Sequence, residues 1–247
     1  MLWQSIKSTF FETLWYQITL VTILLFSFSI YFFLDKSAII LVGEEDGFFE
    51  YLTASLFFVS SVLMLRLALK RNRFFFLFFL LLFIGAGEEI SWGQRILQLD
   101  TPDSIKKMNV QGELTIHNLE FVNRENFNQT VKSGWRKALT INGLYRIFIF
   151  TYGFGLPFLI LFSKKIKSII TVLKLPFPPA FIGFHFILAW LFFKYFNAEF
   201  PPVLHENTAE EIFETMTAWV WLCIGLYFIK SSNNETIVTD RNNKMNS

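Results

Sequence analysis

Long uninterrupted apolar runs dominate the sequence, and short polar or charged segments separate them. The run FFFLFFLLLFIGA at Phe74–Ala86 shows neither a helical nor a strand period, which is typical of a segment surrounded by lipid. Six runs reach about 17–24 residues, the length that spans the hydrocarbon core of a bilayer. We predict an all-α polytopic membrane protein with about six transmembrane helices: Tyr16–Leu34, Phe48–Leu69, Phe74–Leu97, Leu144–Phe162, Ala180–Phe196 and Ile212–Ile229.

Composition supports this class and narrows the chemistry. Hydrophobic residues make up 53% of the 247 residues and charged residues only 17%, which is more apolar surface than a water-soluble domain can bury. The single cysteine, Cys223, excludes a disulfide framework and a cysteine-based metal site. The sequence contains no phosphate loop, nucleophile elbow or basic aromatic patch, so we expect no nucleic-acid binding. We divide the chain into a single transmembrane domain, residues 1–230, and a polar cytoplasmic tail, residues 231–247, predicted to be disordered.

Lysine and arginine are distributed unevenly among the predicted loops. The Lys70–Arg73 turn and the 164–174 loop are basic, whereas the Leu34–Gly47 loop has one lysine and the Asn197–Glu211 loop has neither residue. The positive-inside rule then predicts a multi-pass inner-membrane protein with both termini in the cytoplasm. The Gln98–Gly143 loop, between the third and fourth helices, is predicted to lie outside at the membrane interface.

Half of the chain's 20 acidic residues fall at the predicted outer ends of three helices. They are Glu44, Glu45, Asp46, Glu50, Glu88, Glu89, Glu206, Glu210, Glu211 and Glu214. A helix rises about 22 Å from Phe74 to Glu89, which places Glu88 and Glu89 several ångströms below the outer head groups. An ionised carboxylate facing lipid at that depth costs a few kcal/mol or more, so these side chains should face protein or water. Glu50 and Glu214 each lie one turn inside an apolar helix.

The segment GEEISWGQR at 87–95 is the most specific part of the chain. At helical spacing, Glu88, Trp92 and Arg95 share a face, and Glu89 lies on a neighbouring face. Arg95 could neutralise Glu88 or bind an anionic head group. The alternative is a buried salt bridge that only fixes helix packing.

A short internal similarity links two helix starts that both run inward. Phe49–Ala54 (FEYLTA) matches Phe213–Ala218 (FETMTA), and an acidic residue precedes each glutamate by four positions. If this similarity reflects duplication, the two helices stand parallel and present equivalent faces to a shared centre. Chance is the competing explanation for so short a match.

Two histidines, His117 and His205, lie on the same predicted outer side as the carboxylates. If the segment NVQGELTIHN at 109–118 is helical, Glu113 and His117 share a face and can act as a pair of metal ligands. A lone histidine is more often a hydrogen-bonded structural group. The candidate catalytic residues are Glu50, Glu88, Glu89, Glu214 and Arg95, and the candidate ligands of a divalent metal are Glu89, His117, His205 and Glu214.

The three segments EDGFFEYLTA, GEEISWGQR and NVQGELTIHN together resemble a pattern found in uncharacterised bacterial polytopic membrane proteins. The resemblance covers roughly the first half of the chain and implies no activity. Glu88-Glu89 and Phe181–His185 also match part of the pattern of intramembrane CAAX-type proteases. Because Arg95 comes two residues too late and His185 falls near the opposite side of the membrane, we do not adopt that family.

Three functions are compatible with these features. The first is an enzyme in the outer leaflet that acts on a lipid or lipid-linked substrate, in which the carboxylates exchange protons or hold a divalent metal that activates water. The second is a cation- or proton-coupled transporter. The third is a membrane assembly protein in which the buried charges only specify packing. Metal content of the purified protein separates the first from the others.

Overall fold

The computed structural model describes residues 2–44, 47–124, 126–128, 130–200 and 208–245, and this part of the chain contains helices and loops but no strand. Five helical stretches are long and apolar enough to cross a membrane, which confirms the all-α polytopic class. They are Ile6–Phe33 within α1 (Leu2–Phe33), Phe48–Lys70 (α3), Ile141–Phe162 (α8 to α9), Ala180–Glu199 (α11) and Thr208–Ser231 within α12 (Thr208–Met245). α12 therefore continues past residue 231, into the segment for which the sequence predicts disorder.

The remaining predicted span differs from expectation at its outer end. α4 covers only Phe75–Glu89, 15 residues, so the predicted span Phe74–Leu97 is not one helix over its whole length. Ser91 and Trp92 have φ values of 47° and 54°, a left-handed backbone that ends an α-helix. A single 3₁₀ turn, Ser91–Gly93, and the short helix α5, Gln94–Leu97, follow the break. α4 packs antiparallel along α3 and brings Glu89 to the end of the bundle at which α3 begins.

The fourth span is made of three helical pieces. α8 (Ile141–Phe148) continues through a π-helical segment, Ile149–Gly155, into α9 (Leu156–Phe162). α11 crosses the π-helical segment so closely that a Cβ atom added to Gly183 would lie 1.9 Å from the carbonyl oxygen of Gly153. Glycines at both positions thus permit the contact, as small residues do where membrane helices approach each other.

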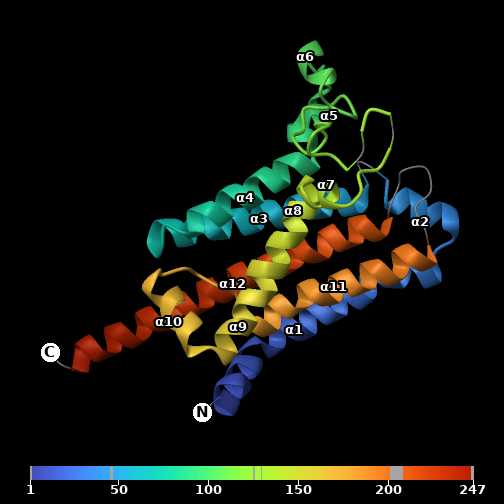
Figure 1. Ribbon diagram of the computed structural model, residues 1–247. Coiled ribbons are helices and arrows are strands. Elements are labelled where there is room, and N and C mark those ends of the chain that lie inside the picture. The colour runs from blue at the N-terminus through green and yellow to red at the C-terminus, as the bar shows by residue number, and fades with distance from the viewer. Residues whose placement is uncertain (1, 45–46, 125, 129, 201–207, 246–247) are drawn as a thin grey trace.

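Four short helices lie at the end of the bundle opposite the start of α1 and the end of α12 (Figure 1). α2 (Lys36–Val42), α5, α6 (Asp103–Lys106) and α7 (Trp135–Ala138) lie at one end. The start of α1, the end of α12 and the lysine-rich helix α10 (Lys164–Val172) lie at the other end. A chain that crosses the bundle an even number of times begins and ends at the same side, as this chain does.

Aromatic rings fill the middle of the bundle. The ring of Trp221, 1% exposed, stacks on Phe148 at a centroid distance of 5.8 Å, and Phe148 stacks on Tyr152 at 5.3 Å. Phe78 from α4 and Phe186 from α11 pack against the same group, at 6.0 and 5.7 Å from Trp221. These contacts join four helices below the level of the carboxylates.

The placement of Lys and Arg predicts which end faces the cytoplasm. We expect a Ser104→Cys variant to react with an impermeant maleimide added outside intact cells, and a Ser168→Cys variant to react only after permeabilisation. Both serines are exposed, whereas the native Cys223 is 4% exposed and should stay unlabelled. Labelling of Ser168→Cys in intact cells, with protection of Ser104→Cys, would reverse the orientation.

Candidate functional site

One cavity of about 920 Å³ lies where α3, α4, α8 and α12 meet the loop between α6 and α7. Glu50 of α3, Glu89 of α4 and Glu214 of α12 all line it. The expectation that these three carboxylates converge on one cavity is confirmed. The convergence follows from the topology, because α3 and α12 begin, and α4 ends, at the same end of the bundle.

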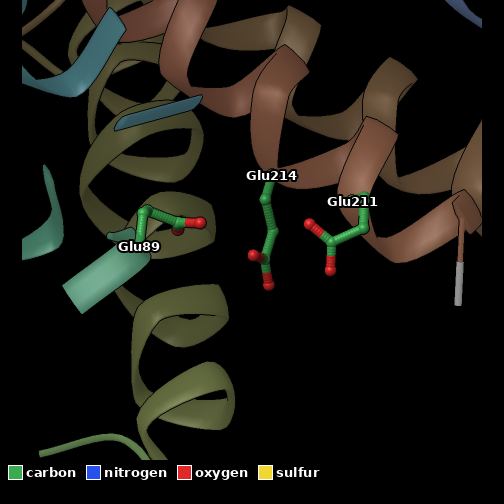
Figure 2. A group of neighbouring side chains, drawn as sticks. All are labelled: Glu89, Glu211 and Glu214. Atoms are coloured by element: carbon green, nitrogen blue, oxygen red, sulfur yellow. The ribbon is translucent and has the colours of Figure 1, made fainter. Parts of the chain in front are cut away.

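The centre of the site is a cluster of three half-buried carboxylates, Glu89, Glu211 and Glu214 (Figure 2). One carboxylate oxygen from each residue lies within 4.8 Å of the others. Glu211 and Glu214 are three residues apart on α12 and therefore share a helix face, which points toward Glu89. Three ionised carboxylates at this separation repel one another strongly unless a proton or a cation lies between them.

A fourth glutamate, Glu210 of α12, faces a different partner. Its Oε1 accepts a hydrogen bond from Nη2 of Arg146, and its Oε2 lies 3.3 Å from Nη1 of Arg124. The Arg146 guanidinium also lies over the rings of Phe193 and Phe213, with its central carbon 5.1 and 5.6 Å from the ring centroids. This pairing fixes α12 relative to α8 beside the cavity.

The carboxylate of Glu88, adjacent to the cluster, holds the outer loop. Its Oε2 accepts hydrogen bonds from the backbone N–H groups of Ile116 (2.7 Å) and His117 (2.8 Å), and lies 3.2 Å from Nδ1 of His117. Its Oε1 accepts a bond of 2.6 Å from Nε1 of Trp92. Both oxygens of Glu88 are therefore engaged in positioning His117 and the end of α4.

The segment at 109–118 is a folded loop, so the helical spacing on which a Glu113–His117 ligand pair depends is absent. The Asn109 side chain binds the loop's own backbone, accepting from the N–H groups of Gln111 and Glu113 and donating to the carbonyls of Glu113 and Thr115. Glu113 accepts a 2.9 Å bond from Ser91 Oγ, while His117 turns to Glu88. The two residues still line the same cavity.

Residues of the 87–95 segment join this loop to the end of α4. A Cβ atom on Gly87 would lie 2.8 Å from the ring of Trp92, so only glycine leaves room for that ring. Gln94 Oε1 accepts a 2.6 Å bond from the N–H of Leu114. The 87–95 and 109–118 segments therefore form one structural unit. Glu88 and Glu89 are successive residues of α4 and point about 100° apart around the helix, so Glu88 faces the loop while Glu89 faces α12.

The two similar hexapeptides pack directly on each other. The hydroxyls of Thr53 and Thr215 lie 2.7 Å apart, and both side chains are fully buried. Thr217, the counterpart of Thr53, accepts a 3.0 Å hydrogen bond from the hydroxyl of Tyr145, a residue of the cavity wall. α3 and α12 thus stand parallel beside the site, as expected.

The other candidates are distributed as follows. His117 lines the cavity but is not one of the three residues of the carboxylate cluster. Arg95 lies in α5, and its side chain is outside the described part of the structure. His205 lies outside the described residues, as do Glu45, Asp46 and Glu206.

Sequence reasoning did not select Glu211 as a site residue. It is among the acidic residues at the start of the sixth predicted helix, one position before the predicted first residue of that helix, Ile212. The spacing of Glu211 and Glu214 was the available signal, since residues three apart on a helix point the same way.

Replacing Glu88 with glutamine is expected to loosen the loop without unfolding the protein. The amide nitrogen of glutamine would face donors that now meet a carboxylate, and a hydrogen bond to a charged group contributes about 1.5–3 kcal/mol. We expect backbone amides at 115–118 to exchange hydrogen with deuterium about tenfold faster or more. Mass spectrometry of the 109–120 peptide measures this, and unchanged exchange would show that Glu88 does not hold the loop.

No protein-family model, curated protein or solved structure matches the chain. Its function is therefore argued from two features of the site itself. These are the carboxylate cluster at Glu89, Glu211 and Glu214, and the cavity onto which that cluster faces.

Proposed function

We propose that this protein is an integral membrane enzyme that hydrolyses an acyl bond in a membrane amphiphile, using a hard divalent cation held by Glu89, Glu211 and Glu214. The observation that carries the proposal is the position of three carboxylate oxygens, within 4.8 Å of one another, on a cavity of about 920 Å³. A cluster with space beside it can hold an ion and a substrate together. A purely structural group of charges has no need of such a space.

The dimensions and chemistry of the cluster suit an oxygen-binding cation. Oxygens on opposite sides of Mg²⁺ lie about 4.2 Å apart, and those on opposite sides of Ca²⁺ about 4.6–5.2 Å apart. An all-carboxylate set favours Mg²⁺, Mn²⁺ or Ca²⁺ over Zn²⁺, which more often takes histidine or cysteine ligands. Three carboxylates leave other coordination positions for water and substrate. A bound ion would act as a Lewis acid toward both.

His117 is the proton acceptor in this proposal. Glu88 binds its Nδ1 at 3.2 Å, which favours the tautomer that carries the proton on Nδ1 and leaves Nε2 as the base. His117 lines the same cavity as Glu214. Water gives its proton to Nε2 of His117 and its hydroxyl to the acyl carbon. The bond from that carbon to the leaving oxygen or nitrogen breaks, and the leaving atom takes the proton.

The centre of the bundle favours an enzyme over a transporter. Below the carboxylates, the stacked rings of Phe148, Tyr152 and Trp221 fill the space between α8 and α12, whereas a transported cation needs polar groups along its route. The cavity therefore serves one end of the bundle.

Titration of purified protein with Mn²⁺, followed by electron paramagnetic resonance, tests the proposal. We expect one Mn²⁺ per chain, which Mg²⁺ or Ca²⁺ displaces. In Glu214→Gln the affinity for Mn²⁺ should fall about tenfold or more. Glu199→Gln is the matched control, since Glu199 is an exposed residue at the end of α11 and does not line the cavity. Wild-type protein that binds no divalent cation, or binding that survives Glu214→Gln unchanged, would refute the metal site.

A further inference from the structure

The carboxylate cavity extends into an apolar groove between two helices. Leu81 and Ile84 of α4 form one wall, and Leu144 and Phe148 of α8 form the other. Leu81, Ile84 and Leu144 are 38%, 42% and 47% exposed. Side chains that line a cavity and remain exposed lie at its rim. In a membrane-spanning bundle this rim faces the hydrocarbon of the bilayer, so a lipid chain can enter from the side.

The groove begins at the cluster and runs toward the middle of the membrane. Leu81 lies eight residues before Glu89 on α4, a helical rise of about 12 Å. A molecule with its reacting bond at Glu89 and its chain along Leu81 and Ile84 therefore has its polar end toward the membrane surface. Its chain points toward the membrane centre, as the chains of the surrounding lipids do.

The charge of the cavity restricts the head group of that molecule. Seven glutamates line the cavity, and among the described residues Arg124 is the one permanently cationic side chain that does so. Arg124 itself lies 3.3 Å from Glu210. A divalent cation, Arg124 and the Arg146 guanidinium that binds Glu210 would together offset four of these seven charges, which leaves the cavity net negative. An anionic head group would meet a net negative field, whereas a cationic one would be attracted.

We propose that the substrate is a membrane amphiphile with an uncharged or cationic head group, whose chain lies in the groove between α4 and α8. This inference rests on the proposed function, because it concerns the substrate of the same site. It excludes lipids whose head group carries a net negative charge. The groove supplies affinity for the chain, and the cavity charge selects the head group.

Photo-crosslinking in neutral nanodiscs tests this inference without requiring catalysis. The probes are three amphiphiles with the same diazirine-bearing acyl chain and an ethanolamide, a quaternary ammonium or a sulfate head group. We expect the first two to label peptides containing Leu81, Ile84 or Leu144 about tenfold more than the sulfate does. Ile84→Trp should fill the groove and reduce this labelling. Leu77→Trp, at an exposed position on α4 that does not line the cavity, should leave it unchanged.

Three results would each overturn the inference: equal labelling by the sulfate probe, labelling centred on Leu77, or labelling that Ile84→Trp does not reduce. The Mn²⁺ titration is read separately from the labelling. Selective labelling without any bound cation would leave the head-group assignment standing and remove the metal mechanism. Cation binding without selective labelling would keep the metal site and remove the head-group assignment.

Discussion

Glu89→Gln is expected to lower Mn²⁺ affinity about a hundredfold or more and to abolish hydrolysis, while the free energy of unfolding stays near the wild-type value or rises. Glutamine keeps the shape and one acceptor oxygen of the side chain but removes one of the three charges of the cluster. In the folded protein that charge lies within 4.8 Å of two others, so its removal relieves repulsion. A residue that matters only for packing would show the opposite pattern.

The measurements for Glu89→Gln are Mn²⁺ binding, release of fatty acid from an acyl ethanolamide, and the unfolding midpoint in mixed micelles. Glu199→Gln serves as the control, with no change expected in any of the three. If Glu89→Gln keeps full metal content and activity, Glu89 is not part of the site. The cation would then have to depend on Glu211 and Glu214 of α12 alone.

The sequence predicted the helices well because membrane spans depend on a property of each segment alone, its apolar length. Five of the six predicted spans are long helices, and the sixth shows where that property is insufficient. α4 ends after Glu89 because Ser91 and Trp92 take a left-handed backbone. That backbone is stabilised by packing of the Trp92 ring on Gly87 and by its bond to Glu88, and apolar length does not encode such contacts.

The site was predictable to the extent that depth in the membrane identifies it. An ionised side chain inside an apolar helix must face protein or water, and this reasoning selected Glu50, Glu89 and Glu214. It did not separate Glu88 from Glu89, which are neighbours at the same depth but face different partners. The contact between Glu88 and His117 joins residues 29 positions apart. Such a pairing depends on the path of the whole loop, which has no periodicity to reveal it.

The second large effect is a loss of stability, expected when Arg146 of α8 is replaced. Arg146 donates to Oε1 of Glu210, and its side chain is 19% exposed, whereas that of Glu210 is 11% exposed. Arg124 contacts the same carboxylate at 3.3 Å but is 42% exposed. The two arginines bind the same carboxylate but differ in burial, so variants of the two can be compared directly. Water can replace Arg124 more easily than Arg146.

Arg146→Met is therefore expected to destabilise the fold by about 3–5 kcal/mol, because it leaves the carboxylate of Glu210 buried without its main partner. Arg124→Met should cost about 1 kcal/mol or less, as solvent-exposed ion pairs do. Equilibrium unfolding in mixed micelles measures both variants. Adding Glu210→Gln to Arg146→Met should recover part of the loss, since it removes the charge that Arg146 no longer offsets. If the two arginine variants lose equal stability, or the double variant recovers nothing, the Arg146–Glu210 pair is not what holds α8 against α12.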